Sequence, residues 1–238
     1  MKIAVSSDWH GMKPAERDRE TISKCDLLLL CGDVFESHHH NEKLENYFRQ
    51  LKSDGIRVVM TPGNHDFGIF YTKYPNEEIP FTRSYGCKKY PLDYLKSELG
   101  IDCLIDQGIE LDGLKIYGTP WTPKFLDWAF MRDDNGSIKE KFDLIPNGLD
   151  ILLCHGPYNN EKDPIDSCCP GLYSGQPDHL GSVQLFKTIL EKQPRFFFCG
   201  HIHSASHLEF NVGKTICSNV SYLGEDYKPH YPIHVIEL

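Results

Sequence analysis

The segment Lys2-Ile3-Ala4-Val5-Ser6-Ser7-Asp8-Trp9-His10 is a short apolar run that stops at an aspartate and a histidine. Four further apolar runs also end at polar residues that can bind a metal. They lead into Gly32-Asp33, Gly63-Asn64-His65-Asp66, His155-Gly156 and Gly200-His201-Ile202-His203. Short apolar runs rich in β-formers and bounded by Gly or Pro are typical of buried strands. The carboxyl ends of parallel strands meet at one edge of an open sheet, so we expect one cluster there.

Strands and helices alternate over the first sixty residues, with strands near 2–7, 26–31 and 56–61 and helices around 14–24 and 41–53. The second helix places Leu44, Tyr47, Phe48 and Leu51 on one stripe of a 3.6-residue period. We expect Asn41 to cap this helix, and Gly55 stands where a C-terminal glycine is expected. The series predicts a parallel sheet with right-handed crossovers.

The rest of the chain is less regular. Residues 67–99 mix aromatic residues with prolines, and we expect either a lid over the site or a packed excursion without substrate contact. The remaining predicted elements are strands near 102–105 and 113–118, a short helix with Phe125, Trp128, Ala129 and Phe130, a helix from Ser182 to Lys192, and strands at 207–212, 214–220 and 232–237 with a hairpin turn at Gly213-Lys214. We find no repeat or linker, which favours a single domain over 1–238.

Composition is that of a soluble globular α/β protein, with 40% hydrophobic and 25% charged residues. A strand at the N-terminus leaves no room for a signal peptide, and nine cysteines without CxxC spacing indicate reduced thiols, so we expect a cytoplasmic protein. No apolar run is long enough to span a membrane. The net charge of −9 disfavours broad binding to nucleic acid but permits a small anionic substrate.

The predicted cluster combines carboxylate and amide oxygens with imidazole nitrogens, a ligand set that suits Mn, Fe, Zn, Ni or Co rather than Ca. Eight such positions are too many for one ion, and a shared carboxylate would let two ions lie close together. Two metals roughly 3.5–4 Å apart are a hydrolytic device for phosphate esters. We therefore expect two divalent metal ions, with manganese the first choice in vitro.

The order of these motifs resembles the calcineurin-like metallophosphoesterase superfamily, whose pattern is D-x-H, G-D-x-x-[DE], G-N-H-[DE], a lone His and G-H-x-H. The matching positions run from Asp8 to His203, most of the chain, and include Gly32-Asp33-Val34-Phe35-Glu36. Tyr117-Gly118-Thr119-Pro120-Trp121, Asp127-Trp128-Ala129-Phe130 and His155-Gly156-Pro157 look like the metallophosphoesterase-domain (MPPED-type) subgroup, which is close to the class III cyclic-nucleotide phosphodiesterases.

The resemblance implies a fold and a role for each matching residue. The fold would be a four-layer α/β/β/α sandwich of two mixed sheets flanked by helices. The first metal would be held by Asp8, His10 and His203, the second by Asn64, His155 and His201, with Asp33 bridging both. His65 would face the phosphate rather than bind metal, with Glu36 or Asp66 as its orienting carboxylate, and Glu36 is favoured because it stands at the matching family position.

The resemblance further implies hydrolysis of a small phosphodiester, cyclic nucleotides among the candidates, by direct attack of a metal-bridging hydroxide. A phosphomonoesterase or nucleotide pyrophosphatase on the same centre is the main alternative. A DNA exonuclease is disfavoured by the acidic charge and by the absence of an added capping domain. A catalytically silent scaffold is disfavoured because every ligand position is kept.

Two further features carry weaker hypotheses. Trp9 and Trp121 could stack on a nucleobase, although we expect both to pack in the core. His38-His39-His40 could touch substrate, although a solvated loop is the expected interpretation.

Overall fold

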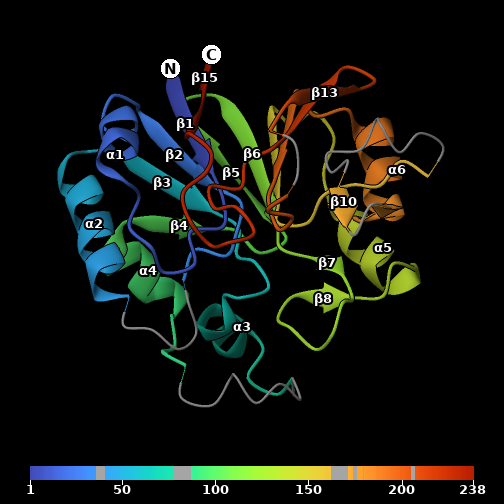
Figure 1. Ribbon diagram of the computed structural model, residues 1–238, viewed down its shortest axis with the longest axis horizontal. Coiled ribbons are helices and arrows are strands. Elements are labelled where there is room, and N and C mark those ends of the chain that lie inside the picture. The colour runs from blue at the N-terminus through green and yellow to red at the C-terminus, as the bar shows by residue number, and fades with distance from the viewer. Residues whose placement is uncertain (36–40, 78–86, 162–170, 174–175, 179, 205–206) are drawn as a thin grey trace.

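We analysed a computed structural model that describes residues 1–35, 41–77, 87–161, 171–173, 176–178, 180–204 and 207–238, with backbone alone for 171–173 and 176–178. Two large sheets lie face to face in the middle of the molecule, and helices cover their outer faces (Figure 1). The predicted layered α/β architecture, with two mixed sheets flanked by helices, is confirmed. No described helix is long and apolar enough to cross a membrane.

The first sheet has the order β15-β1-β2-β3-β4. Strands β1 to β4 run parallel, and β15 pairs antiparallel to β1. The sheet is therefore parallel in its centre, as the strand–helix alternation predicted. Its strands are β1 (Lys2–Ser6), β2 (Leu27–Leu30), β3 (Arg57–Met60), β4 (Ile101–Cys103) and β15 (His234–Glu237).

The second sheet has the order β13-β14-β12-β9-β6-β5. Its four inner strands are parallel, and an antiparallel hairpin closes each edge. The predicted turn at Gly213-Lys214 joins the β13–β14 hairpin, with Val212 opposite Thr215. The strands are β5 (Gln107–Leu111), β6 (Leu114–Thr119), β9 (Ile151–Cys154), β12 (Phe196–Cys199), β13 (Glu209–Val212) and β14 (Thr215–Asn219).

Helices α1 (Glu16–Ile22), α2 (Glu42–Ser53) and α4 (Leu92–Leu99) cover the first sheet, and α5 (Gly136–Phe142) and α6 (Val183–Lys192) cover the second (Figure 1). Helix α3 (Phe67–Lys73) and the small ribbon of β7 (Thr122–Pro123) and β8 (Met131–Arg132) lie near the end of the sandwich away from the chain termini. A second ribbon pairs β10 (Gly171–Tyr173) with β11 (Gln176–Asp178).

Strand β2 shows why its sequence is apolar throughout. All four leucines are fully buried, because each face of the strand meets a different core. Leu27 and Leu29 belong to the core between the sheets, whereas Leu28 and Leu30 pack beneath the helices. A strand buried on both faces reads as a continuous apolar run rather than an alternating one.

Helix α2 follows the sequence prediction closely at one end. Its predicted stripe is buried, and Gly55 follows the helix with a φ of 79°, a conformation that glycine adopts without strain. The prediction for Asn41 is only partly right. Asn41 precedes the helix, but its side chain makes no capping hydrogen bond and donates instead to the Tyr90 hydroxyl at 3.0 Å.

The predicted helix around Phe125 to Phe130 is wrong. This segment is a turn between β7 and β8, and both Leu126 (φ 61°) and Phe130 (φ 52°) adopt left-handed backbone conformations that no α-helix contains. Helices α3, α4 and α5 and strand β5 were not predicted. The three helices have only seven or eight residues each, and β5 is a largely exposed edge strand, so none carries a strong periodic pattern. The predicted lid region includes α3 and α4, and its residues 78–86 lie outside the described part of the chain.

Candidate metal centre

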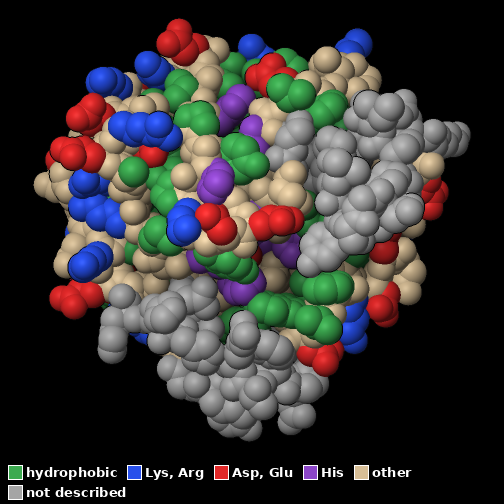
Figure 2. Space-filling view, viewed as in Figure 1, with side chains coloured by type: hydrophobic (Ala, Val, Ile, Leu, Met, Phe, Trp, Pro, Cys, Tyr) green, Lys and Arg blue, Asp and Glu red, His purple; other side chains and the backbone are tan. Residues whose placement is uncertain are grey.

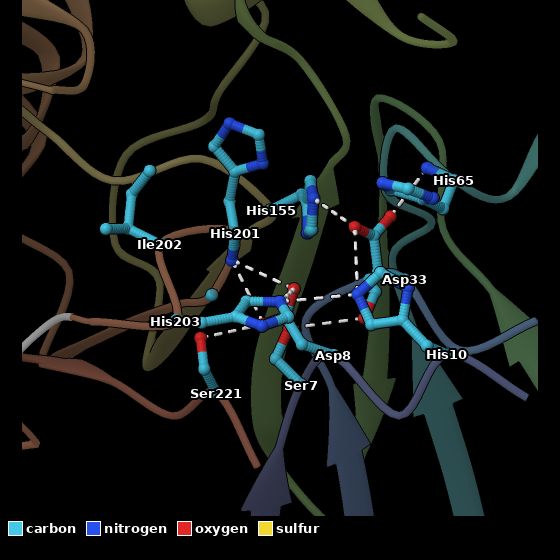
Figure 3. Close-up of polar contacts among 12 residues, drawn as sticks. Ser7, Asp8, His10, Asp33, His65, His155, His201, Ile202, His203 and Ser221 are labelled. Atoms are coloured by element: carbon cyan, nitrogen blue, oxygen red, sulfur yellow. Dashed lines mark hydrogen bonds and ion pairs between the residues drawn. The ribbon is translucent and has the colours of Figure 1, made fainter. Parts of the chain in front are cut away.

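The five predicted motifs meet at one edge of the sandwich, where β1, β2, β3, β9 and β12 all end (Figures 1 and 3). Figure 2 shows histidine side chains gathered near the middle of this face, with acidic side chains beside them. Within the described residues, three groups of acidic and histidine side chains have ligand atoms close enough to share an ion. They are Asp8, His10 and His203; His10, Asp33 and His65; and Asp33, His155 and His201.

Asp8 and His203 form one end of the centre. The chain turns sharply after β1, with left-handed φ angles at Asp8 (57°) and His10 (43°), and this turn directs both side chains inward. The Asp8 Oδ1 atom lies 3.4 Å from His203 Nε2, and His10 Nε2 lies 3.3 Å from the same nitrogen. The Ser221 hydroxyl donates to Asp8 Oδ2 at 2.8 Å and fixes the carboxylate.

His155 and Asn64 form the other end. Asn64 Oδ1 lies 2.8 Å from His155 Nε2, and both side chains are almost completely buried. His201 completes this group with Asp33 and His155. The structure therefore brings Asn64 to the same point as the two histidines, although Asn64 comes from the loop after β3 and the histidines follow β9 and β12.

Asp33 lies between the two ends and faces both. Its Oδ2 atom is 3.3 Å from His155 Nε2 and 3.8 Å from His10 Nε2, whereas its Oδ1 atom accepts the backbone N–H of His65 at 2.7 Å. One carboxylate oxygen thus points at both groups of nitrogen ligands (Figure 3). A carboxylate oxygen placed in this way could be shared by two cations.

The hydrogen bonds of two histidines show that the donor set fits metal ions. His155 Nδ1 lies 2.8 Å from Cys31 O, and His203 Nδ1 lies 3.1 Å from Gly224 O. Since a carbonyl oxygen can only accept, each Nδ1 carries the proton and each neutral ring presents a lone pair at Nε2. The His155 lone pair then faces an amide oxygen and a carboxylate oxygen. Such a collection of acceptors needs a cation or an added proton between them.

The ionisation of these groups reflects their crowding. Burial by itself would lower the pKa of His155, but the charge and hydrogen bond of Asp33 outweigh burial and raise that pKa to about 9. Burial and the neighbouring positive charge of His155 lower the pKa of His201 to about 3. Burial would raise the pKa of Asp33, yet the adjacent histidines hold it well below its usual value. Without metal, the centre is thus a buried ion-pair network.

Two glycines permit this density of side chains. A Cβ atom on Gly63 would lie 2.3 Å from Asp33 Oδ1 and 2.6 Å from His155 Cε1. A Cβ atom on Gly200 would lie 2.2 Å from Asp8 Oδ2. All three distances are far below van der Waals contact, so the motifs need glycine beside their ligands for space.

His65 lies at the open side of the centre, with its ring centroid 4.6 Å from that of His10. Its predicted partner Glu36 lies outside the described residues, as does the histidine run 38–40. The alternative partner Asp66 accepts the backbone N–H groups of Gly63 and Phe35, each at 2.8 Å. We interpret Asp66 as a brace between the loops after β2 and β3.

The hypothesis that Trp9 or Trp121 stacks on a substrate is wrong, because both side chains are completely buried. Trp9 stacks on Phe48 and donates to Ser6 Oγ, and the Trp121 indole donates to Asp106. Their expected role in packing is confirmed.

Several residues at the centre were missed by the sequence analysis. Trp128 places its ring centroid 4.1 Å from that of His65, and Tyr227 packs against His10 and His203 at 4.9 and 5.2 Å. Asn219 donates to Gly200 O and Ile202 O and so holds the loop that carries His201 and His203. Trp128 was noted only as part of the subgroup motif Asp127-Trp128-Ala129-Phe130. No pattern assigned any of these residues to the site, because tertiary proximity alone relates them to it.

Comparison with known proteins gives a consistent picture. The family model described as calcineurin-like phosphoesterase matches residues 1–205. Human metallophosphoesterase domain-containing protein 1 is 34% identical over 222 residues, which cover 90% of this chain and 64% of that protein. The Caenorhabditis elegans UPF0046 protein T07D4.2 is 32% identical over 193 residues, 75% of this chain and 46% of that protein. The chain thus spans about half to two thirds of these relatives.

Solved structures share the fold at much lower identity. Phosphopantetheinyl hydrolase from Mycobacterium tuberculosis superposes with a TM-score of 0.59 at 13% identity, covering 99% of this chain and 95% of that one. The protein TT1561 of Thermus thermophilus superposes with a TM-score of 0.53 at 15% identity, covering 92% and 88%. At these identities the likeness concerns the fold alone.

Proposed function

Because the chain belongs to the calcineurin-like phosphoesterase family, we propose that it is a hydrolase that cleaves phosphoesters with two bound divalent cations. The observation that carries this proposal is the position of Asp33, whose Oδ2 atom faces His10 at 3.8 Å and His155 at 3.3 Å. Burying a carboxylate is costly unless its charge is compensated, and cations held between Asp33 and the facing nitrogens would compensate it. We also propose that residues 1–238 form one domain.

The proposed ligands divide into two sets that share Asp33. Asp8, His10 and His203 would hold one cation, and Asn64, His155 and His201 the other. Hydrogen bonds from Nδ1 of His155 and His203 to backbone carbonyls orient these two rings, which is a common support for metal-binding histidines. The ligand types favour manganese, iron, zinc, nickel or cobalt, and manganese is the first choice for reconstitution.

When bound, the two cations would supply positive charge that polarises the phosphoryl group and favours ionisation of the hydrolytic water. His65 stands next to this centre, within ring contact of His10, and its backbone N–H is bound to Asp33. This hydrogen bond fixes the backbone of His65, from which the side chain extends, relative to the Asp33 carboxylate. We assign His65 to the substrate phosphate, where it would stabilise negative charge or protonate the leaving oxygen.

Water rather than a side chain is the proposed nucleophile, which agrees with direct hydroxide attack and no covalent intermediate. The two serines beside the centre already donate their hydroxyl protons elsewhere, Ser7 to Gly32 O at 3.2 Å and Ser221 to Asp8 at 2.8 Å. The Gly32 carbonyl is not a base, and the Asp8 carboxylate is a proposed metal ligand whose basicity a bound cation would lower, so neither serine is set up as a nucleophile. A phosphorothioate substrate of defined chirality should therefore be hydrolysed with inversion at phosphorus, and retention would exclude this route.

The proposed substrate is a small phosphodiester, with cyclic nucleotides as candidates. The relative named metallophosphoesterase domain-containing protein 1 supports the reaction class, and the motifs of the loop after β6 support the same subgroup. A phosphomonoesterase or pyrophosphatase on this centre is the competing proposal. The cysteine pattern supports a reducing compartment, and on that basis we propose a cytoplasmic location.

The decisive experiment uses protein stripped of metal and reloaded with manganese, nickel, zinc or magnesium. Hydrolysis of bis-p-nitrophenyl phosphate and p-nitrophenyl phosphate is then measured in parallel. We expect metal-dependent turnover with a preference for the diester. His65→Ala should lower turnover by about 100-fold or more, the range of a lost acid–base group, while retaining two metals per chain. Metal content that falls with His65→Ala would contradict its assignment, and no turnover with any metal would contradict the proposed function.

A further inference from the structure

Trp128 is the one tryptophan of the chain that is not buried in a core. The other two, Trp9 and Trp121, are completely buried, whereas Trp128 keeps part of its surface in solvent. Its indole lies against the ring of His65, with a centroid distance of 4.1 Å and an interplanar angle of 51°. The indole of Trp128 therefore lies directly beside His65, the residue that we assign to the substrate phosphate.

The position of Trp128 is tied to the metal centre through the backbone. The next residue, Ala129, donates its N–H to the carbonyl oxygen of Asn64 at 3.3 Å. Thr122 N–H donates to Phe130 O at 3.1 Å and closes the turn between β7 and β8. The indole is thus held at a set distance from a proposed metal ligand and is not carried by a free loop.

Trp128 also lines a cavity of about 350 Å³, together with Phe70 of α3 and residues of the β7–β8 ribbon and its turn. Its lining is mixed. Phe70, Leu126, Phe130 and Met131 supply apolar walls, and Lys124 and Arg132 stand among the carboxylates of Glu77, Asp127 and Asp133. A concave site of this size that combines apolar walls with convergent polar groups is typical of a small-molecule pocket. An aromatic ring would fit it and would contact the indole.

We propose that Trp128 is a specificity-determining residue that stacks on a planar aromatic group attached to the departing oxygen of the substrate. This inference rests on the proposed function, because His65 defines the side on which the leaving group departs. The group bonded to an oxygen protonated at His65 would lie next to the rings that pack on His65, which include His10 and Trp128. His10 is assigned to a metal, whereas Trp128 borders the cavity, so Trp128 is the ring available to that group. Stacking on an indole is tolerant of the exact ring system, so the selected class is aromatic esters over alkyl esters.

The test compares two ligands that have no P–O–C bond to cleave. Benzylphosphonate carries an aromatic ring on a methylene group, and ethylphosphonate carries the same methylene with a methyl group. On manganese-loaded protein we expect benzylphosphonate to bind roughly 10-fold more tightly or better, and to shift tryptophan fluorescence by replacing water at the partly exposed indole. Trp128→Leu should abolish this preference, with the affinity for ethylphosphonate and the metal content unchanged.

Phe125→Leu is the matched control, since Phe125 lies in the same turn, is 70% exposed and does not line the cavity. It should keep the full preference. Equal weakening of both phosphonates by Trp128→Leu would reduce Trp128 to a structural role and overturn the proposal. Equal binding of both ligands by the unaltered protein, with hydrolysis of bis-p-nitrophenyl phosphate intact, would overturn it while leaving the proposed function standing. Loss of binding and hydrolysis together would overturn both.

Discussion

Metal binding should compete with a proton on His155. The Asp33 carboxylate, 3.3 Å from His155 Nε2, helps to raise the pKa of this buried imidazole to about 9 in the metal-free protein. A metal needs the neutral ring, and Nδ1 is already committed to Cys31 O, so the proton must leave from Nε2. At pH 7 only about 1% of such rings are neutral, which weakens apparent metal affinity about 100-fold, or ~2.7 kcal/mol.

We therefore expect the apparent affinity for manganese to rise about 10-fold between pH 7 and pH 8. Calorimetry in buffers of different ionisation enthalpy should show that metal binding releases protons at pH 7. The direct measurement is an NMR titration of the His155 ring in metal-free protein, where the midpoint should lie near 9. His230, which is exposed and paired with Asp226, supplies the control through His230→Gln, which should leave the affinity and its pH dependence unchanged.

The raised pKa of His155 also affects folding stability, which should fall with rising pH where the metal affinity rises. A histidine whose pKa is raised from 6.5 to about 9 stabilises the folded state below pH 6.5, and this contribution is lost as pH rises to 9. Metal-free protein should thus lose stability across that window, whereas metal-loaded protein should gain affinity there. A midpoint below 7 for the His155 ring, or manganese affinity independent of pH from 7 to 8, would refute the reasoning.

Three further predictions concern the support of the centre and of the fold. Gly63→Ala should reduce bound metal and lower the melting temperature, because its Cβ would lie 2.3 Å from the shared aspartate, whereas Gly136→Ala, which meets no atom within 4 Å, should do neither. Glu45→Gln should destabilise the protein by about 1–3 kcal/mol at pH 7, because the buried carboxylate binds Lys88 and two tyrosines. These contacts outweigh burial and lower the pKa of Glu45, so the difference from the unaltered protein, measured by denaturant unfolding, should shrink as pH falls below the ordinary pKa of a glutamate. Asn219→Ala should weaken manganese binding about 10- to 100-fold, since it frees the loop bearing two histidine ligands, and unchanged affinity would show that the loop holds itself.

The elements predicted correctly from the sequence are those whose local pattern has a strong physical cause. Strand β2 was recognisable because burial on both faces requires four apolar residues in a row. Helix α2 was recognisable because its apolar stripe is long enough to show a period. Helix α5 is too short to show such a pattern and was missed. The turn around Leu126 was wrongly predicted as a helix.

By itself, the sequence determined that seven side chains able to bind metal would stand at strand ends, because parallel strands share one carboxyl edge and each motif directly follows an apolar run. Only the tertiary structure decided that one oxygen of Asp33 faces both His10 and His155. It also decided that Trp128 stands beside His65 and that Asn219 holds the loop of His201. Those contacts join residues separated by tens to hundreds of positions, and their distances depend on how two sheets pack rather than on any local preference of the chain.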